Sequence, residues 1–336
     1  MKRWQFWLGM AISALFLYFV LIDIDYTELG TQVAQANYWW ILPGVAVYFV
    51  GLWVRAWRWH YLLRPLKAIP TQAMFPIVTM GYAGNNIFPA RAGEVLRAVL
   101  LKRKQGVSIS ASLATIIVER VYDGVVMLAF IFLNLGELAR LSDDVKLIGE
   151  ATIEDIALWG TVAFLGALVV FLLAAMFPAV SERLAAWVTQ RFVPARLRER
   201  VLDLTKRFLS GLESLRSPQE ALMVFFTSAV IWLLETVKYW FVMHAFGFSV
   251  SFFALMLMNG VVNLATTLPS GAGHAGTFDL PGIAVLRAYG VAKEIATGYT
   301  FVLHFALWFP VTALGLYYMS REGIKWGQVP SEEITA

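Results

Sequence analysis

The sequence predicts an all-α polytopic membrane protein, and residues 1–336 are expected to form a single transmembrane domain. The first reason is composition, because 59% of the residues are hydrophobic and only 15% are charged, against about 25% in soluble domains. The second is several apolar stretches close to the ~20 residues that a helix needs to cross a bilayer. The third is an aromatic content of 15%, since tryptophan and tyrosine are typical of the lipid–water interface.

The same composition excludes several kinds of site. The chain has no cysteine, which excludes disulfides, thiolate catalysis and thiolate metal sites. Its four histidines are far apart in the sequence, and we predict neither a metal site nor a cofactor. The net charge of +4 does not indicate a nucleic-acid partner, since the basic residues lie in loops that flank the apolar stretches.

Basic residues in the loops determine the predicted topology, because cytoplasmic loops carry more Lys and Arg than external loops. A first span at residues 5–22 follows two basic residues and precedes an acidic loop. A second span at residues 38–54 returns, and the loop after it is basic. We therefore expect a multi-pass protein of the plasma membrane with both termini in the cytoplasm.

The third apolar stretch, residues 71–89, is predicted to enter the membrane and turn back. If it crossed, the basic cluster at residues 97–104 would lie outside, against the positive-inside tendency. Its end is rich in glycine, asparagine and proline, which are tolerated at membrane depth where protein or a wet cavity surrounds them. We expect a turn at residues 89–93 and a return helix at residues 94–104.

The remaining apolar stretches continue the alternation. Three full crossings are predicted at residues 108–133, 156–177 and 221–246. The two limbs of a second hairpin follow at residues 251–268 and 280–289, and a last crossing follows at residues 291–319. The second hairpin enters from the outside, opposite to the first. The total is six full transmembrane helices and two oppositely oriented re-entrant hairpins.

A basic linker, residues 178–220, is predicted on the cytoplasmic side. Its apolar residues recur at helical spacing, which indicates amphipathic helices. Two interpretations stay open. The helices lie on the membrane surface with the basic face in water, or they form a hairpin that packs on itself.

The two halves of the chain resemble each other as an inverted repeat, about residues 38–133 and 221–319. The motif from Pro89 to Glu94 aligns with the motif from Pro269 to His274 at an offset of 180 residues. A four-residue insertion then pairs Arg120 with His304. Inverted repeats with broken helices that meet near the bilayer midplane are typical of transporters.

Ionisable residues at membrane depth are candidate functional groups, because each costs about 2.5–3.5 kcal/mol on insertion scales. Glu119, Arg120 and Asp123 lie within one span at helical spacing. They are either a self-neutralised cluster that holds helices together or a polar lining in which Arg120 meets an anion. Glu235 forms an i,i+3 ion pair with Lys238 in the interpretation that we favour. Proton or ion coupling through Glu119, Glu235 or His304 is the alternative.

The two hairpin turns are the predicted binding elements. The first return helix begins near mid-membrane, and free N–H groups at a helix N-terminus attract anions. Arg91 and Arg97 add guanidinium groups that suit a phosphate, while Glu94 caps the helix. The second turn supplies glycines that permit close backbone approach, and Asp279 begins the second return limb.

Polar motifs along the whole chain resemble those of the flippase-like membrane family that includes the transmembrane region of lysylphosphatidylglycerol synthases. The motifs are Arg58-Trp59, Asn86-x-x-Pro89-x-Arg91-x-Gly93-Glu94-x-x-Arg97, Glu119-Arg120-x-x-Asp123 and Pro269-Ser-x-x-Gly273-x-x-Gly276-Thr277-Phe278-Asp279. The resemblance implies translocation of a lipid or a lipid-linked sugar. Two positions depart from the family pattern. Ala272 stands where proline is usual. Asp279 stands where glutamate is usual, so its side chain is shorter by one methylene.

The leading prediction is a non-enzymatic flippase or scramblase for membrane lipids with an anionic or polyprenyl-phosphate-linked headgroup. Motifs and resemblance together suggest this substrate-binding set: Arg58, Asn86, Arg91, Glu94, Arg97, Glu119, Arg120, Asp123, Gly273, His274 and Asp279. One alternative is an enzyme that acts on polyprenyl-phosphate-linked sugars through Asp23 and Asp25. Another is a non-transporting partner of a lipid-modifying enzyme. A homo-oligomer also stays open.

Overall fold

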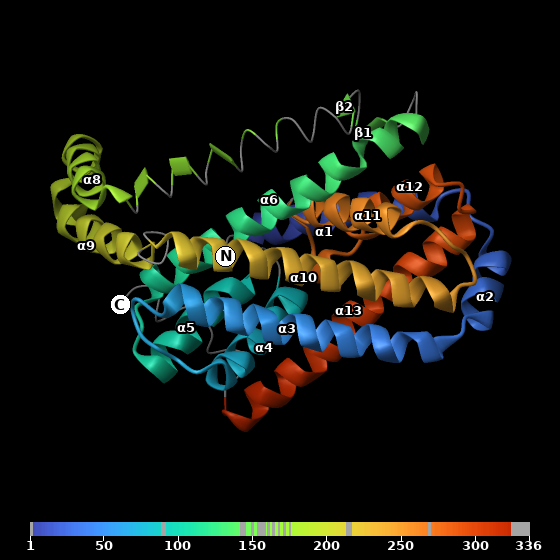
Figure 1. The fold of residues 1–336 in the computed structure, drawn as a ribbon, viewed down its shortest axis with the longest axis horizontal. Helices are drawn as coiled ribbons and strands as arrows, with labels where there is room; N and C mark the ends of the chain where they lie inside the picture. Colours follow the sequence, from blue (N-terminus) through green and yellow to red (C-terminus); the bar gives the residue numbers. More distant parts are fainter. Residues whose placement is uncertain are drawn as a thin grey trace.

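A computed structural model of the chain describes residues 3–88, 92–141, 146–148, 151–152, 159, 162, 165–166, 169–170, 173–174, 176–212, 217–267 and 270–323. These residues form a bundle of helices, so the predicted helical class is confirmed (Figure 1). Beside the helices lies one short antiparallel pair, β1 (Lys146–Ile148) with β2 (Ala151–Thr152).

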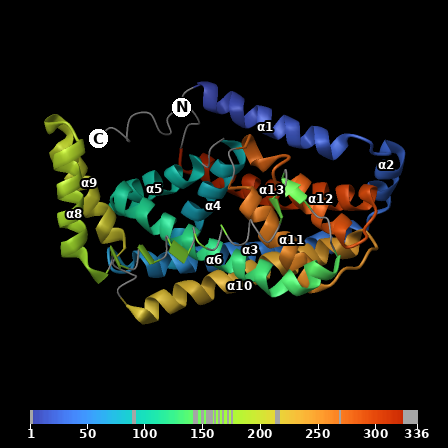
Figure 2. The ribbon, with the colours of Figure 1, turned by 90° about the horizontal axis from the view of Figure 1, so that it is seen from above.

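The bundle has two ends, which we name after the helices that lie there (Figures 1 and 2). At one end lies α2 (Tyr26–Gln35), bent by 92° from α1 (Arg3–Leu21). The sequence predicted only an acidic loop at α2. The helix forms because the Asp25 carboxylate accepts the backbone N–H groups of Thr27 and Glu28 at 2.8 and 3.0 Å, an N-cap.

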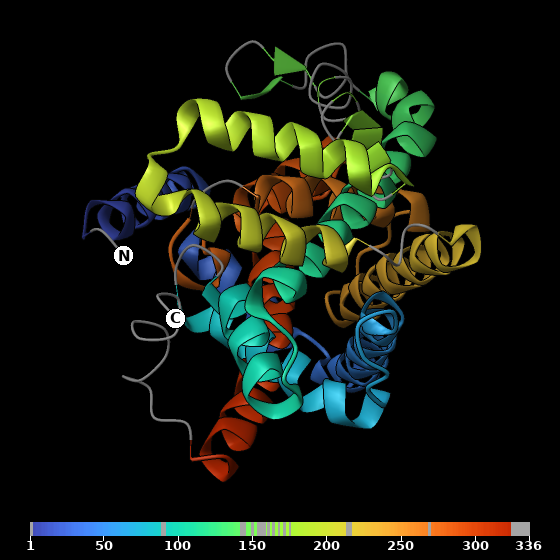
Figure 3. The same cartoon turned by 90° about the vertical axis from the view of Figure 1, so that its left-hand side faces the viewer.

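The other end of the bundle carries α8 (Pro178–Phe192) and α9 (Ala195–Gly211), which pack on each other across the bundle axis (Figure 3). α9 also packs on α6 (Ile109–Leu141), where a Cβ on Gly211 would approach the backbone oxygen of Ala111 to 2.5 Å. The predicted amphipathic linker therefore contains a packed helical hairpin. It still exposes an apolar stripe on α8, made of Val180, Leu184 and Trp187.

A first helical pair, α4 (Thr71–Ile87) and α5 (Ala92–Gln105), enters the bundle from the α9 end and returns to it. The Lys67 ammonium before α4 donates to the backbone oxygen of Gln105 at 2.7 Å. Because this bond joins the start of α4 to the end of α5, both lie at the same end of the bundle.

A second pair, α11 (Phe252–Ala265) and α12 (Asp279–Ala288), enters from the α2 end. The loop before α11 lies at the start of α13 (Lys293–Arg321), where the rings of Phe248 and Tyr299 are 5.2 Å apart. α12 is joined to α13 by only four residues and so ends there as well. The two pairs thus enter from opposite ends.

The tips of the two pairs meet inside the bundle, against α13. Asn86 at the first tip donates to Thr312 Oγ1 at 2.9 Å, and Trp308 Nε1 donates to the Asn86 backbone oxygen at 3.2 Å. At the second tip, in η3 (Ala272–His274), Gly273 has a φ of 68°, and a Cβ there would lie 3.0 Å from Trp308 Nε1. A glycine satisfies both the left-handed backbone and the close approach.

The helices from α3 (Ile41–Leu63) through α6 each pack on the next, and this order of packing recurs in the helices from α10 (Pro218–Ala245) through α13. α3 and α10 lie against each other, and the Asn37 N–H before α3 donates to the Ala245 oxygen at the end of α10. They are therefore antiparallel. Across the halves, α4 packs on α13 and α11 packs on α6. Separate apolar cores surround Trp59 in the first half and Tyr299 in the second.

Among the described residues, three helices are long and apolar enough to cross a membrane: Tyr38–Leu63, Pro218–Ala245 and Lys293–Arg321. The bent α1–α2 pair would make a fourth. α6 is not among them, and it carries Glu119, Arg120 and Asp123 at mid-length. The predicted span at residues 156–177 lies mostly outside the described residues.

Candidate functional site

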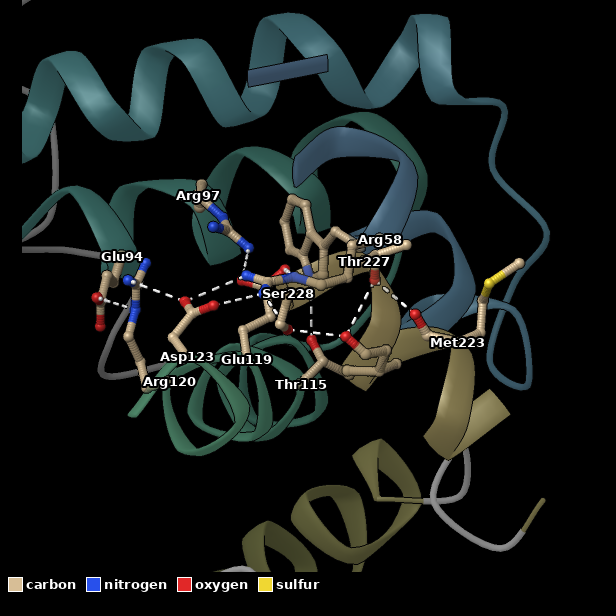
Figure 4. Close-up of polar contacts among 12 residues, drawn as sticks. Arg58, Glu94, Arg97, Thr115, Glu119, Arg120, Asp123, Met223, Thr227 and Ser228 are labelled. Carbon is tan, nitrogen blue, oxygen red and sulfur yellow. Dashed lines mark hydrogen bonds and ion pairs between the residues drawn. The ribbon is translucent and has the colours of Figure 1, made fainter. Parts of the chain in front are cut away.

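A buried ion network joins α3, α6 and α10 (Figure 4). Arg58 on α3 is 1% exposed and binds Asp123 on α6 through two contacts, Nη1 to Oδ1 at 2.5 Å and Nη2 to Oδ2 at 3.3 Å. From α10, Ser228 Oγ accepts from Arg58 at 2.6 Å, and Trp232 Nε1 donates to Asp123 at 2.9 Å. A two-pronged arginine–carboxylate pair of this kind fixes both geometry and charge.

Arg97 extends this network to α5. Its Nη2 donates to Glu119 Oε2 at 2.8 Å, and its guanidinium lies 4.0 Å from the ring centre of Trp59. The side chain runs over Gly81, where a Cβ would come within 2.4 Å of Arg97 Cγ. A glycine at position 81 therefore leaves room for the arginine to reach its carboxylate partner.

Arg120 connects the network to a central cavity of about 150 Å³. Its Nε lies 3.0 Å from Glu94 Oε1, and its Nη1 lies 3.6 Å from Asp123 Oδ2. Unlike Arg58 and Arg97, it is 26% exposed and lines the cavity. Arg120 is thus the member of this network whose guanidinium reaches the open space.

A second cation, Arg55 on α3, also lines the cavity. Its Nη2 donates to Glu235 Oε1 at 3.0 Å, and the other oxygen of Glu235 accepts from Lys238. The Arg55 guanidinium lies between two rings, 5.4 Å from the centre of Tyr82 and 5.0 Å from that of Trp232. The expected Glu235–Lys238 pair is therefore present, and it includes a third member, Arg55, which was expected at the cytoplasmic end of the second span.

His304 on α13 holds the second hairpin tip. Its Nδ1 lies 2.9 Å from Asp279 Oδ1, and its Nε2 lies 2.7 Å from the Gly273 backbone oxygen. Both neighbours are acceptors, and a neutral imidazole has only one N–H, so the imidazolium satisfies both contacts. The second oxygen of Asp279 accepts the Gly276 N–H at 2.8 Å.

Charge around the cavity does not cancel among the described residues. With the His304–Asp279 pair neutral, five cations face four carboxylates: Arg55, Arg58, Arg97, Arg120 and Lys238 against Glu94, Glu119, Asp123 and Glu235. One positive charge is left over. Such a surplus favours an anion.

Three residues that line the cavity each carry a buried polar atom without a hydrogen-bond partner among the described residues. The atoms are Arg55 Nε, Asn85 Oδ1 and Arg120 Nε, the last of which lies 3.0 Å from Glu94 Oε1 as an ion pair. Buried polar atoms are rarely unsatisfied in native proteins, so a water molecule or a ligand group is expected to complete them. The cavity therefore has the character of a binding site.

The structure divides the predicted site residues into groups. Those that line the central cavity are Asn86, Arg120, Glu235, Gly273, His274 and His304. Behind the cavity wall, Arg58, Arg97, Glu119 and Asp123 bind one another. Glu94 contacts Arg120, and Asp279 contacts His304. Arg91 lies outside the described residues. Sequence reasoning missed Arg55, although Glu235 lies at the repeat offset of 180 residues from it.

A second, more open cavity of about 420 Å³ adjoins the first between α1 and α13. Its wall is mainly apolar and includes Leu17, Phe301 and Phe305. The two cavities share these lining residues: Asn86, Gly273, His304 and Trp308. A polar chamber and an apolar groove therefore meet at the hairpin tips.

No metal centre accompanies this site: in the described part of the chain, no group of three His, Asp or Glu residues is placed to hold a metal ion. The predicted acidic residues of the enzyme alternative lie elsewhere, between α1 and α2. Asp25 caps α2, and Asp23 has a φ of 56°.

Comparisons with known proteins give the site its context. Residues 6–315 match the family model described as the lysylphosphatidylglycerol synthase TM region. A UPF0104 membrane protein of Methanothermobacter thermautotrophicus is 24% identical over 91% of this chain and 92% of its own length. Glycosyltransferase AglD of Haloferax volcanii is 25% identical over 91% of this chain and 52% of its own length. No solved structure matches the chain.

Proposed function

The chain belongs to the family of the lysylphosphatidylglycerol synthase TM region, and from this membership we propose that it moves an amphiphile with an anionic headgroup between the two leaflets of the membrane. It is a membrane protein, as its relatives named UPF0104 membrane proteins are. The observation that carries the proposal is the central cavity, which has surplus positive charge and opens on an apolar groove.

Within this proposal the two helical pairs are re-entrant hairpins, and six other helices cross the plasma membrane. The bond between Lys67 and Gln105 supports this topology, because it returns α5 to the end where α4 begins. The antiparallel packing of α3 on α10 supports an inverted repeat over residues 38–133 and 221–319. Both chain termini are proposed to be cytoplasmic, on the side of the α9 end.

In the proposed mechanism the headgroup enters the central cavity while the hydrocarbon chain stays in the apolar groove and in lipid. An arriving anion competes with Glu94 for Arg120 and lies beside Arg55, which also lines the cavity. Charge-assisted hydrogen bonds of this type are roughly twice as strong as neutral ones. Proton or ion coupling through Glu119, Glu235 or His304 is proposed as the energy input where transport runs against a gradient.

Leaflet transfer in proteoliposomes tests the proposal. Vesicles carry a fluorescent tail-labelled anionic lipid, and a membrane-impermeant reductant bleaches the outer leaflet. The wild-type protein should speed transfer above protein-free vesicles, and Arg120→Gln should slow it at least tenfold. Arg207→Gln is the matched control, because Arg207 is 55% exposed and pairs with Asp203 on α9, far from the cavity. Equal rates for wild type and Arg120→Gln would refute the site.

An enzyme that acts on polyprenyl-phosphate-linked sugars is the second candidate. The name of the glycosyltransferase relative and the left-handed backbone of Asp23 favour it, because strained residues cluster at functional sites. Asp23→Asn should then abolish sugar transfer while Arg120→Gln leaves it intact. A role as partner of a lipid-modifying enzyme and assembly into a homo-oligomer are further proposals, for which co-purification is the measurement.

A further inference from the structure

We infer that the central cavity selects lipids whose headgroup is a bare phosphate monoester and rejects cationic and zwitterionic headgroups. This inference rests on the proposed function and names its substrate class. The family name refers to lysylphosphatidylglycerol, whose lysyl group is cationic. The headgroup that we infer for this chain is therefore different from the one in the family name.

Size is the first argument. The cavity measures about 150 Å³. A protein cavity of about 150 Å³ holds a molecule such as benzene, with six heavy atoms. A phosphate group has five heavy atoms and fits this space, whereas an aminoacyl-glycerol or a sugar phosphate is larger and would have to extend into the adjoining cavity, whose wall is mainly apolar. The rest of the lipid must then lie in the apolar groove between α1 and α13.

The second argument concerns what could recognise a cation, and the carboxylates near the cavity are already engaged. The two oxygens of Glu235 meet Arg55 and Lys238. Asp279 meets His304 and the Gly276 N–H, while Glu94 meets Arg120. An incoming ammonium group would therefore have to break an existing buried pair.

Four of the six aromatic rings that line the cavity are occupied as well. Arg55 lies over Tyr82 and Trp232, and Lys238 lies over Tyr48 and Tyr239. These four rings all line the cavity. The faces of these four rings are taken by cations of the protein itself, and Phe278 packs on His304 with ring centres 4.5 Å apart. Among the described lining rings this leaves Trp308, and a single ring does not make a cage for a second positive charge.

Donors for a phosphate, in contrast, are available. Arg120 is partly exposed in the cavity wall, and Arg55 lines the cavity as well. Guanidinium groups match phosphate geometry, and the surplus positive charge compensates a monoanion. The cavity thus offers an environment for a small anion and none for a cation.

Thermal stabilisation of the purified full chain tests the selectivity with two probes of equal chain length, dodecyl phosphate and dodecyltrimethylammonium. Dodecyl phosphate should raise Tm, and the ammonium probe should not. Inorganic phosphate should bind at least tenfold more weakly than dodecyl phosphate, because it lacks the chain. If inorganic phosphate and dodecyl phosphate raise Tm equally, the ligand is free phosphate and not a lipid headgroup. If the ammonium probe raises Tm, the cavity does not reject cationic headgroups.

Asn85→Asp is the sharpest variant, because it is isosteric and adds a negative charge to a residue that lines the cavity. It should weaken dodecyl phosphate binding at least tenfold, while Thr31→Asp on the exposed surface of α2 should not. Arg120→Lys, which keeps the charge, serves if Asn85→Asp does not fold, and it should retain the preference for the phosphate probe. Loss of that preference in Arg120→Lys, or unchanged binding in Asn85→Asp, would count against the inference.

Competition in the leaflet-transfer assay separates this inference from the proposed function. Phosphatidic acid and farnesyl monophosphate, the two lipid sources of a phosphate monoester, should each be transferred at least tenfold faster than lysylphosphatidylglycerol. Equal rates that still depend on Arg120 would overturn the inference and leave the proposed function in place. Transfer of none of the three lipids would refute the proposed function.

Discussion

Asp123→Asn tests whether the buried network behind the cavity holds the helices together. The change keeps the shape of the side chain and removes one negative charge. Arg58 then retains Ser228 and, at 3.8 Å from its Nε, Glu119. Removing one partner of a buried ion pair costs about 3–5 kcal/mol, because the other charge stays buried without compensation.

The expected change in melting temperature follows from the size of the chain. Small proteins unfold with an entropy of about 2.1 cal/mol/K per residue. Over 336 residues, a loss of about 3 kcal/mol then lowers Tm by about 4 °C. Thermal unfolding in detergent, followed by tryptophan fluorescence, measures this shift.

The control for this prediction uses the same pair of residue types at the surface. Asp203 and Arg207 are 2.8 Å apart, and each is 55% exposed. Exposed i,i+4 pairs contribute about 0.3–0.5 kcal/mol, so Asp203→Asn should shift Tm by less than about 1 °C. If Asp123→Asn has the Tm of the wild type, or if Asp123→Asn and Asp203→Asn lower Tm equally, the network does not have the structural role that we assign to it.

Three further predictions concern other parts of the molecule. Gly81→Ala should destabilise the fold by about 1–3 kcal/mol in thermal unfolding, because the new Cβ would meet Arg97. Gly30→Ala has nothing within 4 Å and should stabilise α2 by up to about 1 kcal/mol; the reverse order of the two variants would contradict this packing. Because the chain has no cysteine, Arg64→Cys and Lys102→Cys can be labelled with an impermeant maleimide. Both should react from the same side of the membrane, and labelling from opposite sides would rule out the re-entrant α4–α5 pair.

Much of the helical organisation could be predicted from local patterns in the sequence. Apolar segments and breakers indicated two short helical pairs, and in the structure α4–α5 and α11–α12 enter the bundle from opposite ends. Whether the pairs are re-entrant in a membrane stays a prediction. The helix α2 was missed, although Asp25 and Glu28 have the spacing of an N-terminal cap. A segment without a long apolar run is easily taken for a loop, although Val33 packs against the second core and α2 packs on α13.

The candidate site could be predicted only in part, since its charges find partners far along the chain. Arg55 meets Glu235 across 180 residues, and Arg58 meets Asp123 across 65. Basic residues near the end of an apolar stretch usually mark water, so Arg55 was expected at the cytoplasmic boundary, and Arg58 entered the predicted site through its family motif. In the structure α3 continues to Leu63, which places both arginines inside the bundle.

The measurement that tests the central claim most directly is protection of a cysteine in the cavity by the transported lipid. In proteoliposomes, Asn85→Cys is modified by a small charged thiol reagent while leaflet transfer is followed in the same vesicles. A transported phosphate lipid should slow modification of Asn85→Cys at least tenfold and leave Thr31→Cys on α2 unaffected. Transfer at the wild-type rate with no protection of Asn85→Cys would show that the headgroup takes another route.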